Sequence, residues 1–456
     1  MDTAPTRIDP VICGDPTPSR DRTQLRALDG TTLAQVGLAP RLLAQAAVNR
    51  MRSAADRTAP DPDVFAEAGR LFAHADLEGE SPQEYRQRVS AATGAPIGAI
   101  ERASRGIEEN LGRVDLLNRS ELPAPFAVPG FETRWVPRGA LLAAVVPNNH
   151  PEPNVSWVRA LSLGYGVLVR PGSRDPFTPR RLVAALLAAG LPGDKISLLP
   201  GGHEIGEHLI TQADLGLVYG GPDAVARWGS RDDVLVRGPG NSKALVDVPL
   251  TDALVERLVD WIADDGGVRC NNISAVLVHG DHVALADRLA ERLAELPTLA
   301  PTHPDAALPA IGEDTAEPMR EYLERVTDGA VDHSSHRYPD GPVTRTEDGH
   351  TLMRPLVVST TDTHGDLVGT ELPFPFVVVA PWEDKDDTAP LRDSLVVSVL
   401  SDREDLIGRL LGEPTVRKVV VGHVRPWTSR PEQPHDGSLA GFLTEPKALV
   451  RALPPS

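Results

Sequence analysis

LSLGYGVLVRPGSRDPFTPRRLVAALLAAGLPGDKISLLPGG, residues 161–202, decides the fold class of this chain. The stretch contains the end of a helix, an apolar strand (VLVRP), an amphipathic helix (TPRRLVAALLAAGLP) and a second apolar strand (KISLLP), with short connections between them. Strands that alternate with helices at this spacing are typical of βαβ units, whose strands pair in parallel. The sequence therefore predicts an α/β fold with parallel-rich sheets.

The same alternation continues on both sides of this stretch. Upstream lies the apolar run ALLAAVVP (140–147), and downstream come strands at 215–221, 233–240 and 243–248 with helices between them. The continuous apolar character of LLAAVV indicates a strand that is covered on both faces of its sheet. From residue 249 the alternation resumes after a new amphipathic helix, so we expect a second α/β domain.

These patterns predict four segments. Residues 1–30 are polar and rich in proline and are expected to form an extended N-terminal arm, while residues 31–248 combine a helical segment with the first α/β domain. Within the helical segment, Ser81 followed by Glu84 is a capping-box signature. Residues 249–425 form the second domain, with a polar insertion at about 301–349, and residues 426–456 form a C-terminal segment.

Composition excludes several classes of function. The chain has 456 residues, a hydrophobic content of 41% and a net charge of −18, so nucleic acid and anionic membranes are not expected as partners. Its two cysteines cannot form a disulfide framework, which fits a reducing compartment. We find no signal-peptide core and no span of about 18 apolar residues, so we expect a cytoplasmic protein.

One of the two cysteines, Cys270, stands between Gly266-Gly267 and the apolar run ISAVLV. Glycines allow another group to approach the backbone closely, and the adjacent Arg269 would favour the thiolate, which is the nucleophilic form. The alternative is a buried structural cysteine that acts as a small hydrophobic residue.

Unusual residues follow several of the predicted strands of the first domain, where ligands bind in open parallel sheets. Two amides and a histidine at one strand end could donate hydrogen bonds to a developing oxyanion, and a cation with a hydroxyl suits a ribose or phosphate. Double glycines before a helix allow a pyrophosphate to come close. These loops are Pro147-Asn148-Asn149-His150-Pro151, Arg170-Pro171-Gly172-Ser173, Pro200-Gly201-Gly202 and Tyr219-Gly220-Gly221-Pro222.

In order and spacing, these loops together resemble the aldehyde dehydrogenase superfamily, from about Val136 to the C-terminus. The resemblance implies two Rossmann-type domains and an oligomerisation arm. It maps Asn149 onto the oxyanion-hole asparagine and Cys270 onto the nucleophile. Arg170 stands in place of the usual lysine that holds the adenosine ribose. The resemblance also maps Glu371, in ELPFPF, onto the glutamate that holds the nicotinamide ribose.

The resemblance also implies the cofactor, NADPH or NADH, and its contacts. Arg170 in place of lysine suits a 2′-phosphate, since guanidinium binds phosphate bidentately, and so favours NADPH. No group of His, Cys and Asp has metal-ligand spacing, so no metal is predicted. The predicted cofactor-binding residues are Pro147, Arg170, Gly172, Ser173, Gly201, Gly220, Gly221, Gly238, Glu371 and Phe374.

Arg237 stands roughly where the hydrolytic dehydrogenases carry the glutamate that activates water. Together with Tyr-Gly-Gly-Pro at 219–222, the segment Gly238-Pro239-Gly240-Asn241-Ser242 looks like the acylating, CoA-dependent branch and the long-chain acyl reductases. The resulting hypothesis is the NAD(P)H-dependent reduction of an acyl thioester, delivered by CoA or a carrier protein, to an aldehyde through acyl-Cys270.

Two alternatives stay open at this point. One is an NAD(P)⁺-dependent aldehyde dehydrogenase that forms a carboxylic acid and uses another base, such as Glu204 or Asp264. The other is a catalytically silent dehydrogenase fold kept for binding. His435-Asp436-Gly437, after a proline-rich connector, is expected to line the substrate mouth. By resemblance alone, we expect a homodimer or homotetramer.

Overall fold

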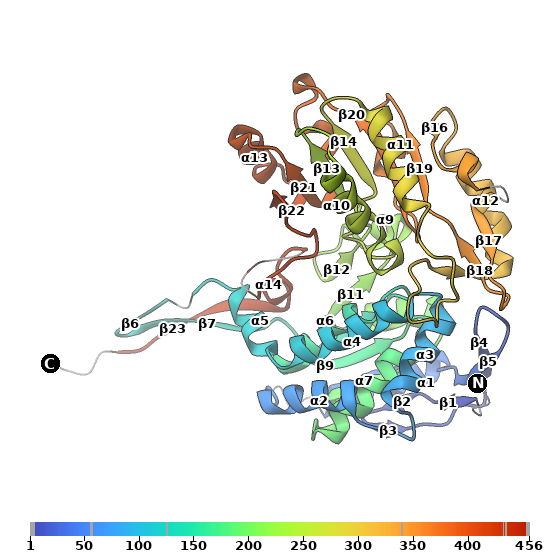
Figure 1. The fold of residues 1–456 in the computed structure, drawn as a ribbon. Helices are drawn as coiled ribbons and strands as arrows, with labels where there is room; N and C mark the ends of the chain where they lie inside the picture. The colour runs from blue at the N-terminus through green and yellow to red at the C-terminus, as the bar shows by residue number, and fades with distance from the viewer. Residues whose placement is uncertain are drawn as a thin grey trace.

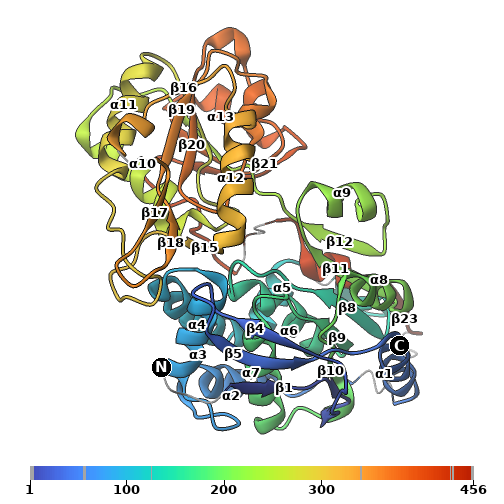
Figure 2. The same ribbon diagram turned by 90° about the vertical axis from the view of Figure 1, so that its right-hand side faces the viewer.

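The computed structural model describes residues 5–54, 58–124, 126–338, 341–431, 433 and 436–452. The chain forms two lobes, which lie one above the other in Figure 2, and an arm that extends from them to one side in Figure 1. Each lobe is built on a parallel-rich sheet with helices against it, as the alternating pattern predicts.

The sheet of the first lobe follows the order β12-β11-β8-β9-β10-β2-β3. Strands β8 to β12 run parallel to one another, and β2 pairs antiparallel with β10 at the edge. The strands are β2 (Val11–Ile12), β3 (Asp15–Pro16), β8 (Leu141–Val145), β9 (Gly166–Arg170), β10 (Ile196–Leu198), β11 (Leu215–Tyr219) and β12 (Val234–Arg237).

Helices from two parts of the chain pack around this sheet. Four of them connect its strands: α6 (Val155–Ser162), α7 (Phe177–Ala188), α8 (His203–Gln212) and α9 (Pro222–Trp228). The others come from the predicted helical segment: α1 (Arg41–Ser53), α2 (Pro62–His74), α3 (Pro82–Thr93), α4 (Ile97–Leu111) and α5 (Val114–Ser120). The predicted capping box is present at the start of α3, with Ser81 and Glu84 bonded reciprocally.

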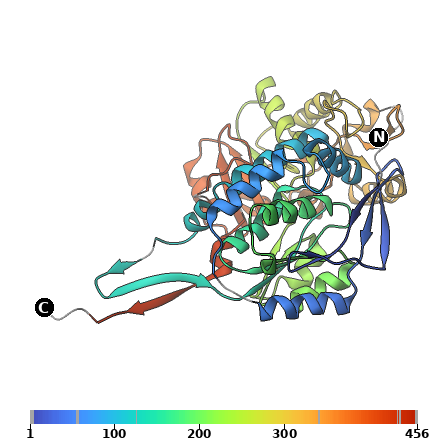
Figure 3. The ribbon, with the colours of Figure 1, turned by 90° about the horizontal axis from the view of Figure 1, so that it is seen from below.

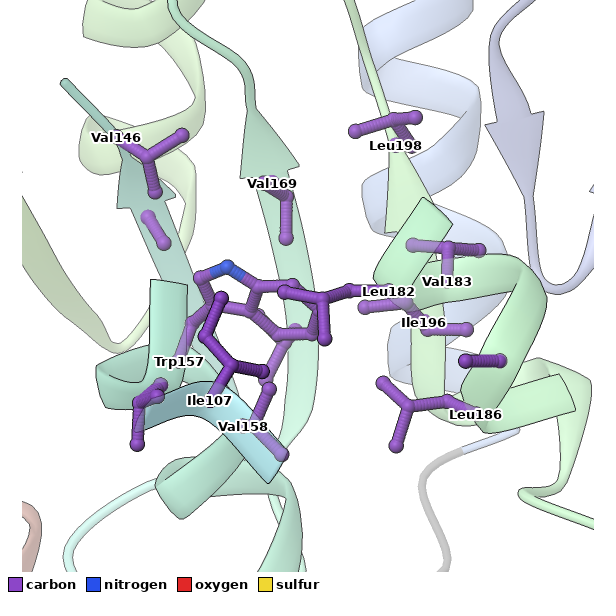
Figure 4. Close-up of a cluster of buried hydrophobic side chains, with 14 of the residues drawn as sticks. Ile107, Val146, Trp157, Val158, Val169, Leu182, Val183, Leu186, Ile196 and Leu198 are labelled. Carbon is purple, nitrogen blue, oxygen red and sulfur yellow. The ribbon is translucent and has the colours of Figure 1, made fainter. Parts of the chain in front are cut away.

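Side chains from these helices and strands form a continuous apolar core. Figure 4 shows Trp157 of α6 lying between Ile107 of α4 and Val169 of β9. Trp157 and Ile107 are fully buried, and burying a side chain of this size contributes about 2 kcal/mol or more to stability. This core gives the strand ends of the first sheet a rigid base.

The N-terminal prediction needs correction. Residues 1–30 were expected to form an extended arm, but the described part of this segment is folded onto the first lobe. Strand β5 pairs with β1 in parallel and with β4 antiparallel. Ile8, Ile12 and Leu25 are buried in the cores of the first lobe, so a few apolar side chains anchor this polar segment. These strands are β1 (Thr6–Ile8), β4 (Arg22–Arg26) and β5 (Thr32–Gly37).

The sheet of the second lobe follows the order β16-β19-β20-β14-β13-β21-β22, parallel except for β16. Its strands are β13 (Lys243–Val246), β14 (Ala275–Val278), β16 (Val331–Asp332), β19 (Leu356–Ser359), β20 (Phe376–Pro381), β21 (Ser394–Leu400) and β22 (Val416–Val421). Helices α10 (Asp252–Ala263), α11 (His282–Leu293) and α13 (Glu404–Leu411) belong to this lobe.

The predicted domain boundary at residue 248 is also displaced. Strand β13 was assigned to the first domain, yet it pairs with β14 and β21 in the middle of the second sheet. The crossing between lobes therefore lies in residues 238–242, immediately before β13. An apolar strand alone does not reveal which of two similar sheets it joins, because both offer the same backbone hydrogen bonds.

The insertion at 301–349 is more ordered than a surface loop. It contains α12 (Glu313–Val326), where the sequence EPMREYLERV predicts a helix, and strands β15 (Ala310–Ile311) and β17 (Val343–Arg345). Both strands pair antiparallel with β18 (Thr351–Met353).

The arm joins the C-terminal segment to the middle of the chain. Strand β23 (Thr444–Val450) pairs along its whole length with β7 (Phe131–Pro137), which also pairs with β6 (Ala127–Val128). Figure 3 shows this ribbon extending away from both lobes, and α14 (Leu439–Leu443) lies at its base. Along the described parts of the chain, none of the helices combines the length and apolar character needed to cross a membrane.

Candidate active site

The candidate site lies at the junction of the two sheets, where the loop after β8 contacts the loop that carries Cys270. Neighbouring strands β20, β14 and β13 of the second sheet present their amino ends there. The residues just before these strands are Glu371, Cys270 and Gly240, so three segments that are distant in the sequence converge. The carboxyl ends of the first sheet contribute Asn149, Tyr219 and Arg237 from the opposite side.

Gly240 touches the backbone of Cys270. A Cβ atom at Gly240 would lie 1.8 Å from the Cys270 carbonyl oxygen and 2.8 Å from its Cα. The Ser242 hydroxyl donates to the same carbonyl at 2.8 Å. These two contacts hold the cysteine against the segment that crosses between the lobes.

Cys270 is half-buried, and the charges of two acidic groups act on its thiol. Burial raises its pKa to about 12, with further increases from the charges of Glu371 and Asp436 and a decrease from Arg269. The thiol form therefore prevails at neutral pH in this state, and a base must remove the proton before the sulfur can act as a nucleophile.

The structure limits the role predicted for Arg269. Its guanidinium does lower the pKa of Cys270, but it also binds Asp264 at 3.1 Å and Asp265 at 2.9 Å and lies over the ring of Trp427. Two carboxylates largely neutralise this cation. Arg269 thus acts in the direction predicted from sequence, but its effect on the pKa of Cys270 is smaller than that of burial and of the nearby acids.

The Glu371 carboxylate is held beside the crossing segment. Its Oε2 accepts hydrogen bonds from the backbone N–H groups of Gly240 and Asn241, both at 2.8 Å. Burial nevertheless raises the pKa of Glu371, and those two hydrogen bonds oppose the increase. A carboxyl group with a raised pKa is a better proton acceptor. Of the charges that act on the Cys270 thiol, that of Glu371 has the largest effect on its pKa.

Asn149 reaches across the junction from the first lobe. Its Nδ2 donates to the carbonyl of Val268, two residues before Cys270, at 2.8 Å. An amide nitrogen carries two hydrogens, so one remains for an oxyanion formed beside the sulfur. The structure therefore brings Asn149 to the loop that carries Cys270.

Arg237 ends strand β12 and faces the C-terminal segment. Its Nη1 lies 3.1 Å from Asp436 Oδ2 and also donates to the Asp436 backbone carbonyl. The neighbouring β11 position is Tyr219, whose hydroxyl lies 2.7 Å from Ser156 Oγ. Asp436 was expected at the substrate mouth, and its charge does act on Cys270; His435 lies outside the described residues.

The predicted cofactor loops line the carboxyl ends of the first sheet. The strand order of this sheet reverses between β8 and β11: β9 and β10 follow on one side of β8, and β11 and β12 on the other. Ligands bind at such topological switch points. Arg170 is buried, with Nε donating to the Gly201 carbonyl at 3.1 Å, and burial lowers its pKa. Pro147 is half-buried and Ser173 exposed beside these loops.

The glycines of these loops differ in the space beside them, and of the five predicted to bind the cofactor only Gly221 faces open space. A Cβ at Gly172 would lie 2.3 Å from Asn148 Oδ1, whereas one at Gly221, before α9, would meet nothing within 4 Å. Gly220 and Gly238 approach each other, since a Cβ at Gly238 would lie 2.8 Å from the Gly220 carbonyl. Among the described residues, Arg237 Nε and Asn271 Oδ1 are buried without hydrogen-bond partners beside this space. The open backbone at Gly221 and these two unused polar atoms fit a bound nicotinamide dinucleotide.

Two predicted roles change. The Phe374 side chain is 1% exposed and packs against Phe376 in the core of the second lobe, so it does not face the cofactor loops. Its segment is instead pressed on Gly267, where a Cβ would meet the Phe374 and Pro375 backbone. Asp264, one of the alternative bases, is engaged by Arg269 at 3.1 Å.

Sequence reasoning missed Asp265, a buried carboxylate that contacts Arg102, Arg269 and His150. The available signal was the doublet Asp264-Asp265 before Gly266-Gly267, because aspartate and glycine both tolerate the left-handed backbone of tight turns. No local pattern indicates which distant cations such a carboxylate will meet.

The chain matches the aldehyde dehydrogenase family over residues 19–394. Malonate-semialdehyde dehydrogenase 2 of Geobacillus thermodenitrificans (strain NG80-2) is 27% identical over 281 residues, which cover 58% of this chain and 56% of the relative. N-succinylglutamate 5-semialdehyde dehydrogenase of Chromohalobacter salexigens is 33% identical over 181 residues, 37% of each chain. The chain thus aligns with about half or less of the length of these two relatives.

Solved structures share the fold over nearly the whole chain. Aldehyde dehydrogenase 21 from Physcomitrella patens, solved with the reaction product succinate, has a TM-score of 0.81 at 17% identity and covers 98% of this chain and 99% of its own. An indole-3-acetaldehyde dehydrogenase solved with NAD⁺ has a TM-score of 0.80 at 20% identity, with 98% and 97% covered. At these identities the likeness establishes the fold.

Proposed function

The chain belongs to the aldehyde dehydrogenase family, and we propose that it oxidises an aldehyde to a carboxylic acid with NAD(P)⁺ through a covalent intermediate on Cys270. The observation that best supports this proposal is the position of Cys270 at the junction of the two sheets. Asn149 is hydrogen-bonded to the loop that carries Cys270, and the charge of Glu371 acts on the thiol. The relatives named above are semialdehyde dehydrogenases, which favours oxidation over the thioester reduction inferred from sequence.

In this proposal Glu371 accepts the proton of the Cys270 thiol, and the sulfur adds to the aldehyde carbonyl carbon. The free hydrogen of Asn149 Nδ2 and the Cys270 backbone N–H stabilise the oxyanion, each worth about 3–4 kcal/mol when well placed. The bound nicotinamide dinucleotide supplies the hydride acceptor. Loss of hydride from the carbon leaves acyl-Cys270, and water then cleaves the C–S bond to give the acid and the thiol.

Arg237 supports a second candidate, the thioester chemistry expected from sequence. It occupies the place of the water-activating glutamate, and its guanidinium binds Asp436 at 3.1 Å. Without a free carboxylate at this position, acyl-Cys270 would last long enough for a thiol such as CoA to accept the acyl group. The same steps in reverse reduce an acyl thioester to an aldehyde.

Product analysis separates the two candidates. Purified protein is incubated with semialdehydes and NAD⁺ or NADP⁺, with and without CoA, and with acyl-CoA and NADH or NADPH. Free acid without CoA supports the hydrolytic oxidation; acyl-CoA formed only with CoA, or aldehyde formed from acyl-CoA, supports the thioester chemistry. If neither reaction occurs although the dinucleotide binds, the enzymatic proposal fails and the binding-only hypothesis gains support.

The acidic surroundings of Cys270 predict an unusual pH dependence. In a Cys13→Ser background, alkylation by iodoacetamide should rise about tenfold per pH unit from pH 7 to 9 without a plateau, because the thiolate fraction grows tenfold per unit below a pKa of about 12. Glu371→Gln removes the first of the raising charges, lowers the pKa and should speed alkylation at pH 8 severalfold while slowing turnover.

The control for this experiment is Glu256→Gln, which removes a carboxylate from an exposed ion pair with Arg292 on the surface of the second lobe. We expect no change in its alkylation profile. A plateau near pH 8 in the Cys13→Ser protein, or an unchanged rate in Glu371→Gln, would contradict the electrostatic account.

Glu204 predicts a preference for NAD⁺ over NADP⁺. Its carboxylate lies over the start of α8, so close that a Cβ at Gly202 would be 2.2 Å from its Oε2. Its charge raises the pKa of Arg170, against the lowering effect of burial. An acid at the ribose position repels a 2′-phosphate. This reverses the preference inferred from Arg170 alone, because the arginine is buried and already engaged by Gly201.

Glu204→Gln should therefore improve NADP⁺ binding about tenfold relative to NAD⁺, measured as dissociation constants by calorimetry without substrate. Glu207→Gln, on the same helix in an exposed pair with Arg227, is the control and should leave the ratio unchanged. Tighter binding of NADP⁺ than of NAD⁺ by the unmodified protein would contradict the prediction.

Assembly into a homodimer or homotetramer remains a prediction. The arm is the region that supports it, because β6, β7 and β23 expose Val128, Phe131 and Val450 well away from both cores. Exposed apolar side chains of this size on a projecting ribbon are typical of surfaces that pair with another chain.

A further inference from the structure

The loop that carries Cys270, residues 268–272, is called the catalytic loop below. The segment just before it has a strained backbone. Asp265, Gly266 and Gly267 are consecutive and all left-handed, with φ values of 54°, 79° and 70°. Glycine adopts this conformation freely, but a non-glycine residue such as Asp265 is strained in it. Such strain persists only where the surroundings enforce it, so the contacts of the Asp265 side chain are of interest.

The Asp265 carboxylate is the centre of a buried ionic cluster. Arg102 Nε donates to Oδ1 at 2.8 Å, with a second bond from Nη2, and Arg269 Nη1 binds Oδ2 at 2.9 Å. His150 Nε2 lies 3.5 Å from the same Oδ2. The side chain is 1% exposed, and although burial raises its pKa, His150, Arg269 and Arg102 together hold that pKa well below its usual range.

The partners of Asp265 come from both lobes. Arg269 belongs to the catalytic loop itself, whereas Arg102 lies on α4 and His150 in the loop after β8. The backbone N–H of Glu152 donates to His150 Nδ1 at 3.3 Å, which places the ring hydrogen on Nε2, and this buried atom has Asp265 Oδ2 at 3.5 Å and no hydrogen-bond partner among the described residues. A single carboxylate thus connects two elements of the first lobe to the segment that carries the nucleophile.

This connection lies beside the reacting groups. Asn149 precedes His150 and donates to the Val268 carbonyl at 2.8 Å, three residues after Asp265 and two before Cys270. Two adjacent residues of the loop after β8 therefore contact the segment around Cys270 at two positions: His150 at Asp265 and Asn149 at Val268. We therefore expect a change in the Asp265 contacts to alter the separation between the Asn149 amide and the Cys270 sulfur.

We propose that Asp265 is a positioning residue, which clamps Arg102 and His150 onto the catalytic loop and so sets the distance between the oxyanion donor Asn149 and the nucleophile Cys270. The inference rests on the proposed function for its catalytic meaning. The clamp itself is a property of the folded chain, and it can be measured without turnover.

Glycine at position 265 separates the clamp from the backbone. Asp265→Gly keeps the left-handed conformation and relieves its strain, so it is neutral or stabilising if the residue serves only the turn. Under the clamp it lowers kcat about 10- to 100-fold, because a misplacement of about 1 Å costs about that much, while KM for the dinucleotide changes less than twofold. Asp265→Asn tolerates this backbone and keeps one acceptor oxygen, which can serve Arg102 or Arg269 but not both, so it should restore only part of the kcat that Asp265→Gly loses.

Two further variants keep the test sharp if the glycine variant folds poorly. Arg102→Met removes one arm of the clamp from a half-exposed side chain without touching the strained segment, and should lower kcat severalfold. The control is Asp260→Asn, which changes a residue of the nearby helix α10. It breaks the exposed ion pair of Asp260 with Arg425 and should leave kcat unchanged. Thermal unfolding of all variants reports any general loss of stability.

Hydrogen exchange gives a readout independent of activity. In Asp265→Gly, amides of residues 147–152 and 264–272 should exchange at least tenfold faster, while those of α11 remain as in the unmodified protein. Wild-type kcat and exchange in Asp265→Gly would overturn the clamp. If the unmodified protein oxidises no aldehyde but the exchange difference is present, the proposed function fails and the clamp stands.

Discussion

Cys270→Ala should lower kcat/KM for aldehyde oxidation by at least about a thousandfold, because no other nucleophile replaces the sulfur in forming the acyl intermediate. Alanine leaves the partly buried position without strain, so the free energy of unfolding should change by less than about 1 kcal/mol. Dinucleotide binding, measured by calorimetry, should also be retained, which separates a chemical defect from a binding defect.

Intact-protein mass spectrometry provides the direct check. With NAD⁺ and a semialdehyde, rapid acid quenching of the unmodified protein should trap a fraction with the mass of one acyl group, and peptide mapping should place it at Cys270. Cys13→Ser is the control and should behave like the unmodified protein, since Cys13 lies on the N-terminal strands against Ser197. Retention of more than a tenth of the activity in Cys270→Ala would rule out the covalent route.

Gly240→Ala should lower kcat about a hundredfold. The new Cβ would lie 1.8 Å from the Cys270 carbonyl oxygen and 2.6 Å from its carbonyl carbon, and both are backbone atoms that cannot rotate away. The loop must therefore shift by about 1 Å, which moves the sulfur away from Asn149, and such a shift costs about a hundredfold in rate. The overpacking should also cost about 1–3 kcal/mol of stability.

The comparison for this prediction is Gly408→Ala, at a helical position of α13 where a Cβ would meet nothing within 4 Å. Alanine there should stabilise the protein by about 0.5–1 kcal/mol and leave kcat unchanged. Measurement of kcat, of thermal unfolding and of the rate of Cys270 alkylation distinguishes displacement of the nucleophile from general instability. A kcat within threefold of the unmodified protein in Gly240→Ala would contradict the predicted contact.

Much of the fold follows from local patterns. The alternation at 161–202 predicts parallel βαβ units, and the strands and helices it indicates are present as β9, α7 and β10. The capping box at Ser81 and Glu84 is present as well. These features depend on residues close in sequence, whose hydrophobic period and cap chemistry suffice to define an element.

Which sheet a strand joins is a different matter. Strand β13 and the N-terminal strands were assigned wrongly, since β13 belongs to the second sheet and Ile8 and Leu25 anchor the N-terminal segment in the first core. Apolar strands present similar backbone hydrogen bonds to every sheet edge. Partner choice is made by packing between distant elements, which no local pattern contains.

For the active site, the sequence alone singled out Cys270 and Asn149, each in a pattern that suits the chemistry proposed for it, and its resemblance to the family set Arg237 where a base was expected. Only the tertiary structure decided their surroundings: Glu371 and Asp436 beside the sulfur, Arg269 neutralised by two acids, and Asp265 joining the lobes. The reason is physical. Residue type defines which reactions a side chain can perform, whereas its pKa and alignment depend on charges and contacts brought together only by folding.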